Sequence, residues 1–246
     1  MTRILNISAY LFTPLADPPA WRDRIRAEAS RHALRGTVLL AGEGINLFLA
    51  GEPPAVRAFV AWLRGDPSFA ALQAKESGSR ERPFRKLLVK VKREIIRMNE
   101  PAIRPAAGRA PAVDAATLAR WLDRGRDDHG RPLVMLDTRN GFEVDHGRFR
   151  GALDWRLARF SDFPRALAAH GDTLRGKTVV TYCTGGIRCE KAALHMARAG
   201  VEHVLQLNGG ILAYFAQAGA RHFDGHCFVF DQRLTLDATL AEAPAA

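Results

Sequence analysis

Hydrophobic and polar positions follow a regular pattern over the first hundred residues. Apolar residues between Pro18 and Leu34 recur at helical spacing until Gly36, and Gly42-Glu43-Gly44 separates two short apolar runs, which indicates a hairpin. The predicted strands are 3–12, 37–40, 45–50, 69–76 and 86–91, and the predicted helices are 18–34 and 53–63. The order β-α-β-β-α-β predicts a ferredoxin-like α+β sandwich, which we place at residues 1–98.

This pattern stops at Asn99. Residues 99–113 are rich in Pro and Ala and have no hydrophobic periodicity, so they are expected to form a linker. Beyond Asp114 apolar strands alternate with helices, which predicts a parallel sheet covered by helices. The expected strands are 133–137, 178–182 and 204–207, and the expected helices are 117–122, 163–170, 190–199 and 211–218. We therefore predict an α/β domain at 114–223 and a C-terminal extension at 224–246.

Composition supports compact domains. The chain has 246 residues, 47% of them hydrophobic, and no uninterrupted apolar run of about 18 residues that could cross a membrane. The first twelve residues are expected to form a strand and not a signal peptide, so we expect a soluble, cytoplasmic protein. Three cysteines are too few for a disulfide framework, and nothing in the sequence indicates an oligomeric state.

The chain is strongly basic, with a net charge of +10, which indicates either a polyanionic partner or simply a basic proteome. The segment 80–97 stands out, because it contains eight basic residues and only two acidic ones, Glu81 and Glu94. Lys86, Lys90 and Lys92 share parity, so a strand would place them on one face. The segment is either an RNA-binding surface that contacts phosphates or an ordinary solvated face. Its basic residues are Arg80, Arg82, Arg85, Lys86, Lys90, Lys92, Arg93 and Arg97.

The candidate chemistry lies at Cys183, which directly follows the apolar strand 178–182. The carboxyl end of a parallel strand is where open α/β sheets bind ligands. Two glycines let the following loop turn several N–H groups toward one point, and a helix is expected to open near Cys189 or Glu190. Such a loop lowers the pKa of a cysteine and predicts a reactive thiolate. The residues of this anion-binding loop are Thr184, Gly185, Gly186, Ile187 and Arg188.

Each candidate has a plainer alternative. Cys183 could be a small buried hydrophobe, and Cys189 could be either a redox partner or a packing residue. Cys227 is expected to be an apolar strand residue. Asp137 and Arg139, at the end of the strand 133–137, could support the loop or hold Arg188, but we interpret them mainly as a structural ion pair. No Cys-x-x-Cys pair or histidine spacing suggests a metal site, and no cofactor motif is evident.

Four motifs in order resemble a rhodanese domain. They are Asp137-Thr138-Arg139, the segment 148–152, the Cys183 loop, and Leu207-Asn208-Gly209-Gly210-Ile211. The resemblance implies a rhodanese-like parallel-sheet domain with a catalytic cysteine. Because the loop has the length Cys-x4-Arg, which in this superfamily goes with sulfur chemistry, a phosphatase is disfavoured.

Over nearly the whole chain, the sequence resembles the tRNA uridine hydroxylase family of rhodanese-like proteins. The motifs that carry this resemblance are 182–192, 36–41 with 43–46, and 227–231. It implies an acylphosphatase-like first domain and oxygen-dependent conversion of the wobble uridine (U34) to 5-hydroxyuridine. It also implies an essential Cys183, molecular oxygen as co-substrate, and the anticodon stem-loop of tRNA as partner. The chain departs from the family at Leu47-Phe48 and lacks the cysteine-rich tail of longer members.

Two other functions remain open at this stage. A rhodanese-type sulfurtransferase would carry a persulfide on Cys183, and a non-catalytic tRNA-binding adaptor would keep the loop only as an anion site. Within the hydroxylase interpretation, Cys183 could carry either a persulfide or a covalent RNA adduct. The hairpin around Glu43 is either a binding element or a tight turn.

Overall fold

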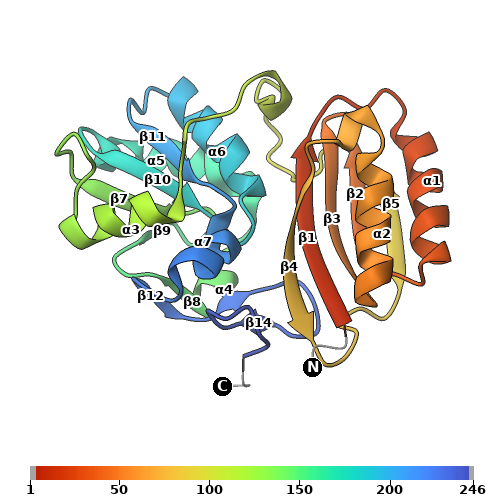
Figure 1. Cartoon of the computed structure of the whole chain (residues 1–246). Helices are drawn as coiled ribbons and strands as arrows, with labels where there is room; N and C mark the ends of the chain where they lie inside the picture. The colour runs from red at the N-terminus through yellow and green to blue at the C-terminus, as the bar shows by residue number, and fades with distance from the viewer. Residues whose placement is uncertain (1–3, 244–246) are drawn as a thin grey trace. The chain divides into compact units, whose positions relative to one another are not determined.

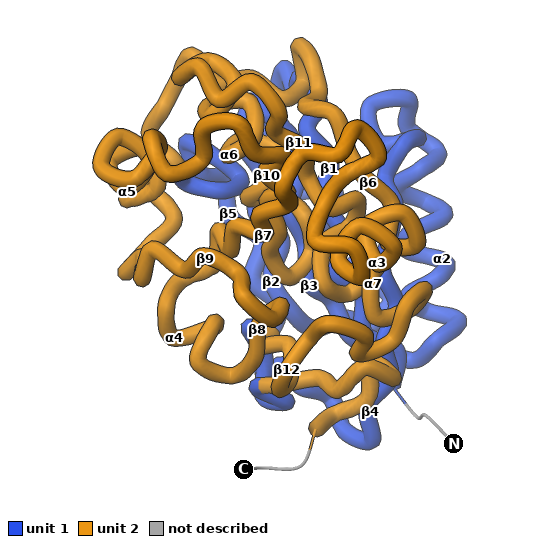
Figure 2. The backbone as a smooth tube through the Cα atoms, turned by 90° about the vertical axis from the view of Figure 1, so that its left-hand side faces the viewer, with its two compact units in different colours: residues 1–97, 230–234 blue, residues 98–229, 235–246 orange. Residues whose placement is uncertain are grey.

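The computed structural model describes residues 4–243 and divides into two compact units (Figure 2). The first unit comprises residues 1–97 and 230–234, and the second comprises 98–229 and 235–246. Residue 3 of the predicted first strand and the last three residues of the predicted extension lie outside the described part. In that part, no helix has the length and apolar character needed to cross a membrane.

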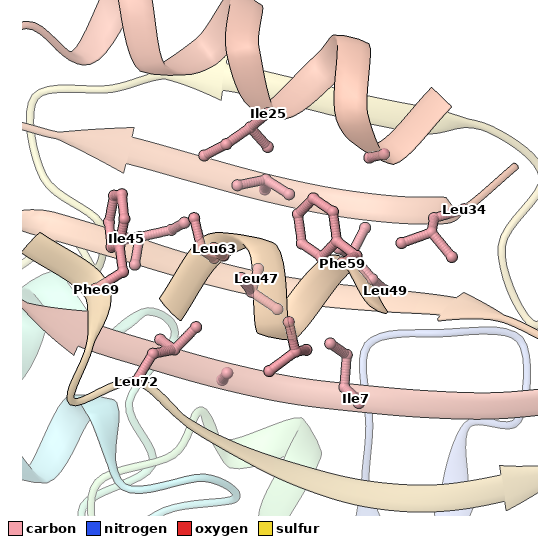
Figure 3. Packing of buried hydrophobic residues seen from close by; sticks show 14 of the residues in the cluster. Ile7, Ile25, Leu34, Ile45, Leu47, Leu49, Phe59, Leu63, Phe69 and Leu72 are labelled. Carbon is pink, nitrogen blue, oxygen red and sulfur yellow. The ribbon is translucent and has the colours of Figure 1, made fainter. Parts of the chain in front are cut away.

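The first unit is an α+β sandwich, as the sequence predicts. Its five-stranded sheet has the order β4-β1-β3-β2-β5, antiparallel except for the β2–β5 pair. Both helices cover one face of the sheet (Figure 1), and side chains from the helices and the sheet meet in one core (Figure 3). The elements are β1 (Ile4–Phe12), α1 (Pro18–Arg31), β2 (Arg35–Ala41), β3 (Gly44–Gly51), α2 (Pro53–Arg64), β4 (Gln73–Ser79) and β5 (Leu87–Val91).

The structure corrects two boundaries in this unit. Helix α1 ends at Arg31, not at residue 34, because Ala33 has a left-handed φ of 51° that closes the helix. The predicted strand 69–76 begins only at Gln73. Asp66 accepts a hydrogen bond from the Ser68 N–H at 3.0 Å and Pro67 follows it, so the chain first makes a 3-10 turn that buries Phe69. The hairpin of β2 and β3 is confirmed.

The second unit contains a five-stranded parallel sheet of order β6-β11-β10-β7-β9. Helices α3 and α7 pack together over a core that includes Met135 and Val180, and α6 lies along β10 and β11. The elements of the sheet and its helices are β6 (Ala112–Val113), α3 (Ala115–Arg124), β7 (Leu133–Asp137), α4 (Gly141–Val144), β9 (Leu153–Asp154), α5 (Phe163–His170), β10 (Thr178–Tyr182), α6 (Ile187–Arg198), β11 (Val204–Leu207) and α7 (Gly210–Ala218). The predicted α/β class is confirmed.

Two short antiparallel pairs complete this unit. Strand β8 (Gly147–Phe149) pairs with β12 (Phe223–Gly225), and β13 (Cys227–Phe228) pairs with β14 (Thr235–Leu236). The Pro- and Ala-rich segment 99–113 also belongs here, because β6 joins the sheet and Gln206 Nε2 donates to the Ala110 carbonyl at 3.2 Å. The segment is therefore bonded to the sheet by both main-chain and side-chain contacts.

Candidate active site

Cys183 lies immediately after the central strand β10, at the carboxyl end of the parallel strands. Tyr182 pairs with Asp137 across β10 and β7, so the residues that follow both strands meet at this end. Gly186, with φ of 100°, caps a helix that opens at Ile187, two residues earlier than the sequence predicts. Arg188 consequently lies in the first turn of α6 and not in the loop. Only Gly185 of this loop is partly exposed.

The Cys183 sulfur is held as a thiolate. Burial by itself would raise the pKa of Cys183, but the Cys189 thiol, the Arg188 charge and the N–H groups of Arg188 and Gly186 outweigh burial and lower the pKa to about 5. The Gly186 N–H lies 3.1 Å from Sγ. Burial and the hydrogen bond to Cys183 raise the pKa of Cys189 well above its usual value. The site therefore pairs one thiolate with one neutral thiol.

Arg188 is fixed by Glu143, a residue that sequence reasoning missed. The two guanidinium nitrogens donate to the two carboxylate oxygens at 2.5 and 2.8 Å, and both side chains are buried. Glu143 Oε1 also accepts the Asn140 N–H at 3.0 Å as part of a capping box that opens α4. The spacing from Asn140 to Glu143 is the only sequence signal for this residue. The ion pair holds one positive charge beside the loop.

Asp137 and Arg139 form a second buried ion pair next to the first. The Arg139 Nη2 lies 2.6 Å from Asp137 Oδ2 and donates to the Gly147 carbonyl at 2.7 Å. Arg139 Nη1 reaches the backbone carbonyl of Glu143 at 3.4 Å. Since Arg188 pairs with Glu143 and not with Asp137, this second pair supports the segment that carries Glu143.

Thr138, between the two members of that pair, contacts the residues that flank the Cys183 loop. Its N–H and hydroxyl both donate to the Tyr182 carbonyl, at 2.9 and 3.0 Å. The same hydroxyl lies 3.7 Å from Cys189 Sγ. Sequence reasoning passed over this residue, although it stands in the Asp-Thr-Arg motif. Thr138 thus ties the end of β7 to the end of β10 and to Cys189.

The start of α7 closes the loop from the other side. The N–H groups of Ile211 and Leu212 donate to the carbonyls of Cys183 and Thr184, at 2.9 and 3.1 Å. Gly210 has φ of 67°, and a Cβ there would lie 2.4 Å from the Cys183 carbonyl oxygen. This close approach explains the glycine at position 210.

Cys227 belongs to the wall of the site and not to its chemistry. It is fully buried in the hydrophobic cluster of the second unit. Burial raises the pKa of the Cys227 thiol to about 12, so the side chain is neutral at physiological pH. The next residue, Phe228, accepts the Thr184 hydroxyl through its carbonyl at 3.3 Å.

The basic segment predicted from the sequence lies in the first unit, around β5. Val89 is buried in the core, whereas Lys90 pairs with Leu39 of β2 and is exposed on the opposite face of the sheet. Arg82 is half-buried, and the other seven basic residues are exposed, namely Arg80, Arg85, Lys86, Lys90, Lys92, Arg93 and Arg97. Lys86, Lys90 and Lys92 thus lie in or next to the edge strand β5, whereas Arg80 directly follows β4 at the other edge of the sheet.

The Glu43 hairpin has a structural role in this unit. Glu43 Oε1 accepts the Ile95 N–H at 2.8 Å, and Asn46 Nδ2 donates to the Ile95 carbonyl at 3.2 Å. Together they hold the chain just beyond β5. Within residues 4–243, no group of three or more histidine, cysteine or acidic side chains could hold a metal ion.

Comparison with known proteins agrees with this architecture. Residues 4–95 match the family described as UPF0176 acylphosphatase like domain, and residues 114–217 match the rhodanese-like domain. The chain is thus a two-domain rhodanese-like protein with an acylphosphatase-like first domain.

Curated relatives align over nearly the whole chain. A protein of Bordetella pertussis is 64% identical over 98% of this chain and 99% of its own length. A protein of Variovorax paradoxus is 60% identical over 100% of this chain and 93% of its own length. A protein of Ralstonia nicotianae is 57% identical over 98% of this chain and 86% of its own length. All three are named tRNA uridine(34) hydroxylase. The chain belongs to the tRNA uridine(34) hydroxylase family.

Proposed function

We propose that this protein hydroxylates uridine 34 of tRNA to 5-hydroxyuridine, with Cys183 as the catalytic residue. The observation that carries the proposal is the buried Cys183 thiolate, which accepts the Gly186 N–H and lies beside the neutral Cys189 thiol. Its support is the identity of about 60% to relatives named for this activity. These relatives do not favour the sulfurtransferase alternative.

Cys183 is proposed to act as a nucleophile on the uracil ring. A thiolate that adds to C6 of uracil raises the electron density at C5, which is the position that receives the hydroxyl group. After oxygen has bonded to C5, loss of the C5 proton to solvent and elimination of the thiolate from C6 restore the C5–C6 double bond and free Cys183. The pKa of about 5 keeps Cys183 ionised at neutral pH, so no separate base is required for its activation.

Molecular oxygen is the proposed co-substrate. One oxygen atom enters the base, and the second must leave as water, which takes two electrons and two protons. Once Cys183 is released from C6, the Cys183 thiolate and the Cys189 thiol supply the two electrons and one proton by closing to a disulfide, and solvent supplies the second proton. An external dithiol then returns both cysteines to the reduced state. Cys189 is therefore proposed as the redox partner of Cys183, and the residues present require no resident cofactor for this balance.

The basic segment is the proposed RNA-binding surface. Lys86, Lys90 and Lys92 lie in and beside β5 and are exposed, which fits contact with successive phosphates of the anticodon stem-loop. Since the proposed substrate is tRNA, the cytoplasm is the proposed compartment of the reaction.

The proposed function is tested by nucleoside mass spectrometry of tRNA from a deletion strain. Wild type is expected to restore 5-hydroxyuridine and its derivatives, and Cys183→Ser is not. Cys227→Ala removes a buried thiol outside the loop and serves as the control that restores the nucleoside. Restoration by Cys183→Ser would remove Cys183 from the chemistry. Thiosulfate:cyanide activity in a protein whose deletion leaves tRNA unchanged would instead establish the sulfurtransferase.

A further inference from the structure

Three aromatic rings lie together in the second unit, and two of them come from exposed residues. Phe142 is 47% exposed and meets the Phe228 ring edge-on, with 5.3 Å between the centroids. His146 is also exposed, and its ring lies 5.3 Å from Phe228 at a tilt of 32°. An exposed aromatic side chain that packs against further rings is unfavourable in water and is typical of a binding surface. We call these three residues the aromatic platform.

The platform is joined to the Cys183 loop at two points. Phe142 precedes Glu143, whose carboxylate holds Arg188. The Phe228 carbonyl accepts the hydroxyl of Thr184, the residue after Cys183. Neighbouring residues of a helix point about 100° apart, so α4 directs Glu143 inward and leaves Phe142 at the surface. The main chain of the platform is therefore joined to Thr184 directly and to Arg188 through Glu143.

We propose that the aromatic platform stacks the unpaired base next to the target uridine when that uridine reaches Cys183; this rests on the proposed function. A base that contacts a buried thiolate must leave its own stack, which also deprives its neighbour of a stacking partner. Aromatic side chains replace that partner in proteins that bind single-stranded RNA, and they do so for any base. Phe142 supplies the ring, Phe228 packs against it edge-on, and His146 packs against Phe228.

The first experiment separates aromatic stacking from apolar bulk. Phe142→Ala and Phe142→Leu are expected to lower kcat/KM on an anticodon stem-loop RNA by about 5- to 100-fold, the range expected for loss of one stacked base. Phe142→Tyr keeps the ring and is expected to retain activity. The thermal unfolding midpoint and the thiolate titration of Cys183 should be the same in all three variants. Full activity of Phe142→Leu would overturn the proposal.

The second experiment needs no catalysis. 2-Aminopurine is placed on one side of the target uridine and then on the other, and its fluorescence is measured on binding. Wild type and Phe142→Tyr are expected to change the fluorescence of one of the two RNAs, and Phe142→Ala and Phe142→Leu are expected to abolish that change. Equal fluorescence with all variants would overturn the platform and leave the hydroxylase function standing. Failure of the wild type to form 5-hydroxyuridine would instead count against the function.

Discussion

Glu143 and Arg188, 45 residues apart in the chain, form a buried two-pronged ion pair at 2.5 and 2.8 Å. The pair joins α4, which follows β7, to the first turn of α6, which follows β10. It fixes the Arg188 charge beside the Cys183 thiolate, and burial makes it costly to break.

Glu143→Gln is expected to destabilise the protein by about 3 to 5 kcal/mol, because it leaves the buried Arg188 charge without a counter-charge. Denaturant unfolding measures the loss. Asp145→Asn is the matched control, since Asp145 also makes a two-pronged pair, with Arg156, but at an exposed position. A much smaller loss is expected there. Equal effects of the two substitutions would contradict a special role for burial.

The Cys183 thiolate predicts a pH-dependent stability. Because the folded pKa of about 5 lies below the unfolded value of about 8.5, the thiolate stabilises the fold fully above about pH 8.5. This contribution is lost as pH falls toward about 5. Urea unfolding should therefore show that the free energy of unfolding of the wild type, relative to that of Cys183→Ser, increases as pH rises from about 5 to about 8.5. A constant difference would show that the pKa is not lowered.

Cys189→Ala is expected to raise the pKa of Cys183, because it removes the thiol that donates to the thiolate. Thiolate absorbance, measured as the difference from Cys183→Ser across a pH series, gives the titration midpoint. Cys227→Ala is the control, and its midpoint should stay near that of the wild type. An unchanged midpoint in Cys189→Ala would also weaken its proposed role as redox partner.

Gly210→Ala is expected to disrupt the loop through steric contact. The added Cβ would lie 2.4 Å from the Cys183 carbonyl oxygen and 2.8 Å from that of Thr184. Gly125→Ala is the control, because Gly125 has nearly the same φ, 66° against 67°, and open space around the missing Cβ. Both variants bear the cost of a left-handed alanine, about 1 kcal/mol. Only Gly210→Ala should lose more than this in urea unfolding and shift the Cys183 titration.

The basic segment predicts a strong dependence of tRNA binding on salt. Replacing Lys86, Lys90 and Lys92 by alanine is expected to weaken binding and to lower the slope of log Kd against log salt concentration by about 1 for each phosphate that the variant no longer neutralises. Filter binding over a salt series measures both. Arg165→Ala, which removes a charge that is 86% exposed in the second unit, should leave the slope unchanged. An unchanged slope in the triple variant would place the RNA elsewhere.

Local patterns in the sequence determined much of this protein. The alternation of apolar runs and turn residues sufficed for both fold classes, because each element buries a face that its own spacing defines. The position of Cys183 also followed from local signals, since an apolar strand and a Gly-Gly turn precede a helix. The shared parity of Lys86, Lys90 and Lys92 placed only Lys90 on a face of β5, because the strand spans Leu87–Val91.

Only the tertiary structure decided how Arg188 is held. Glu143 lies in a helix of four residues, which is too short to show a hydrophobic period, and its capping signal predicts a helix start but not a partner. Asp137 is the last residue of β7 and lies beside Tyr182 of β10. It nevertheless pairs with Arg139 and not with Arg188. Ion-pair partners depend on which strand ends the sheet brings together. The order of β7 and β10 in the sheet, and not residue spacing, therefore determined which carboxylate holds Arg188 beside the Cys183 thiolate.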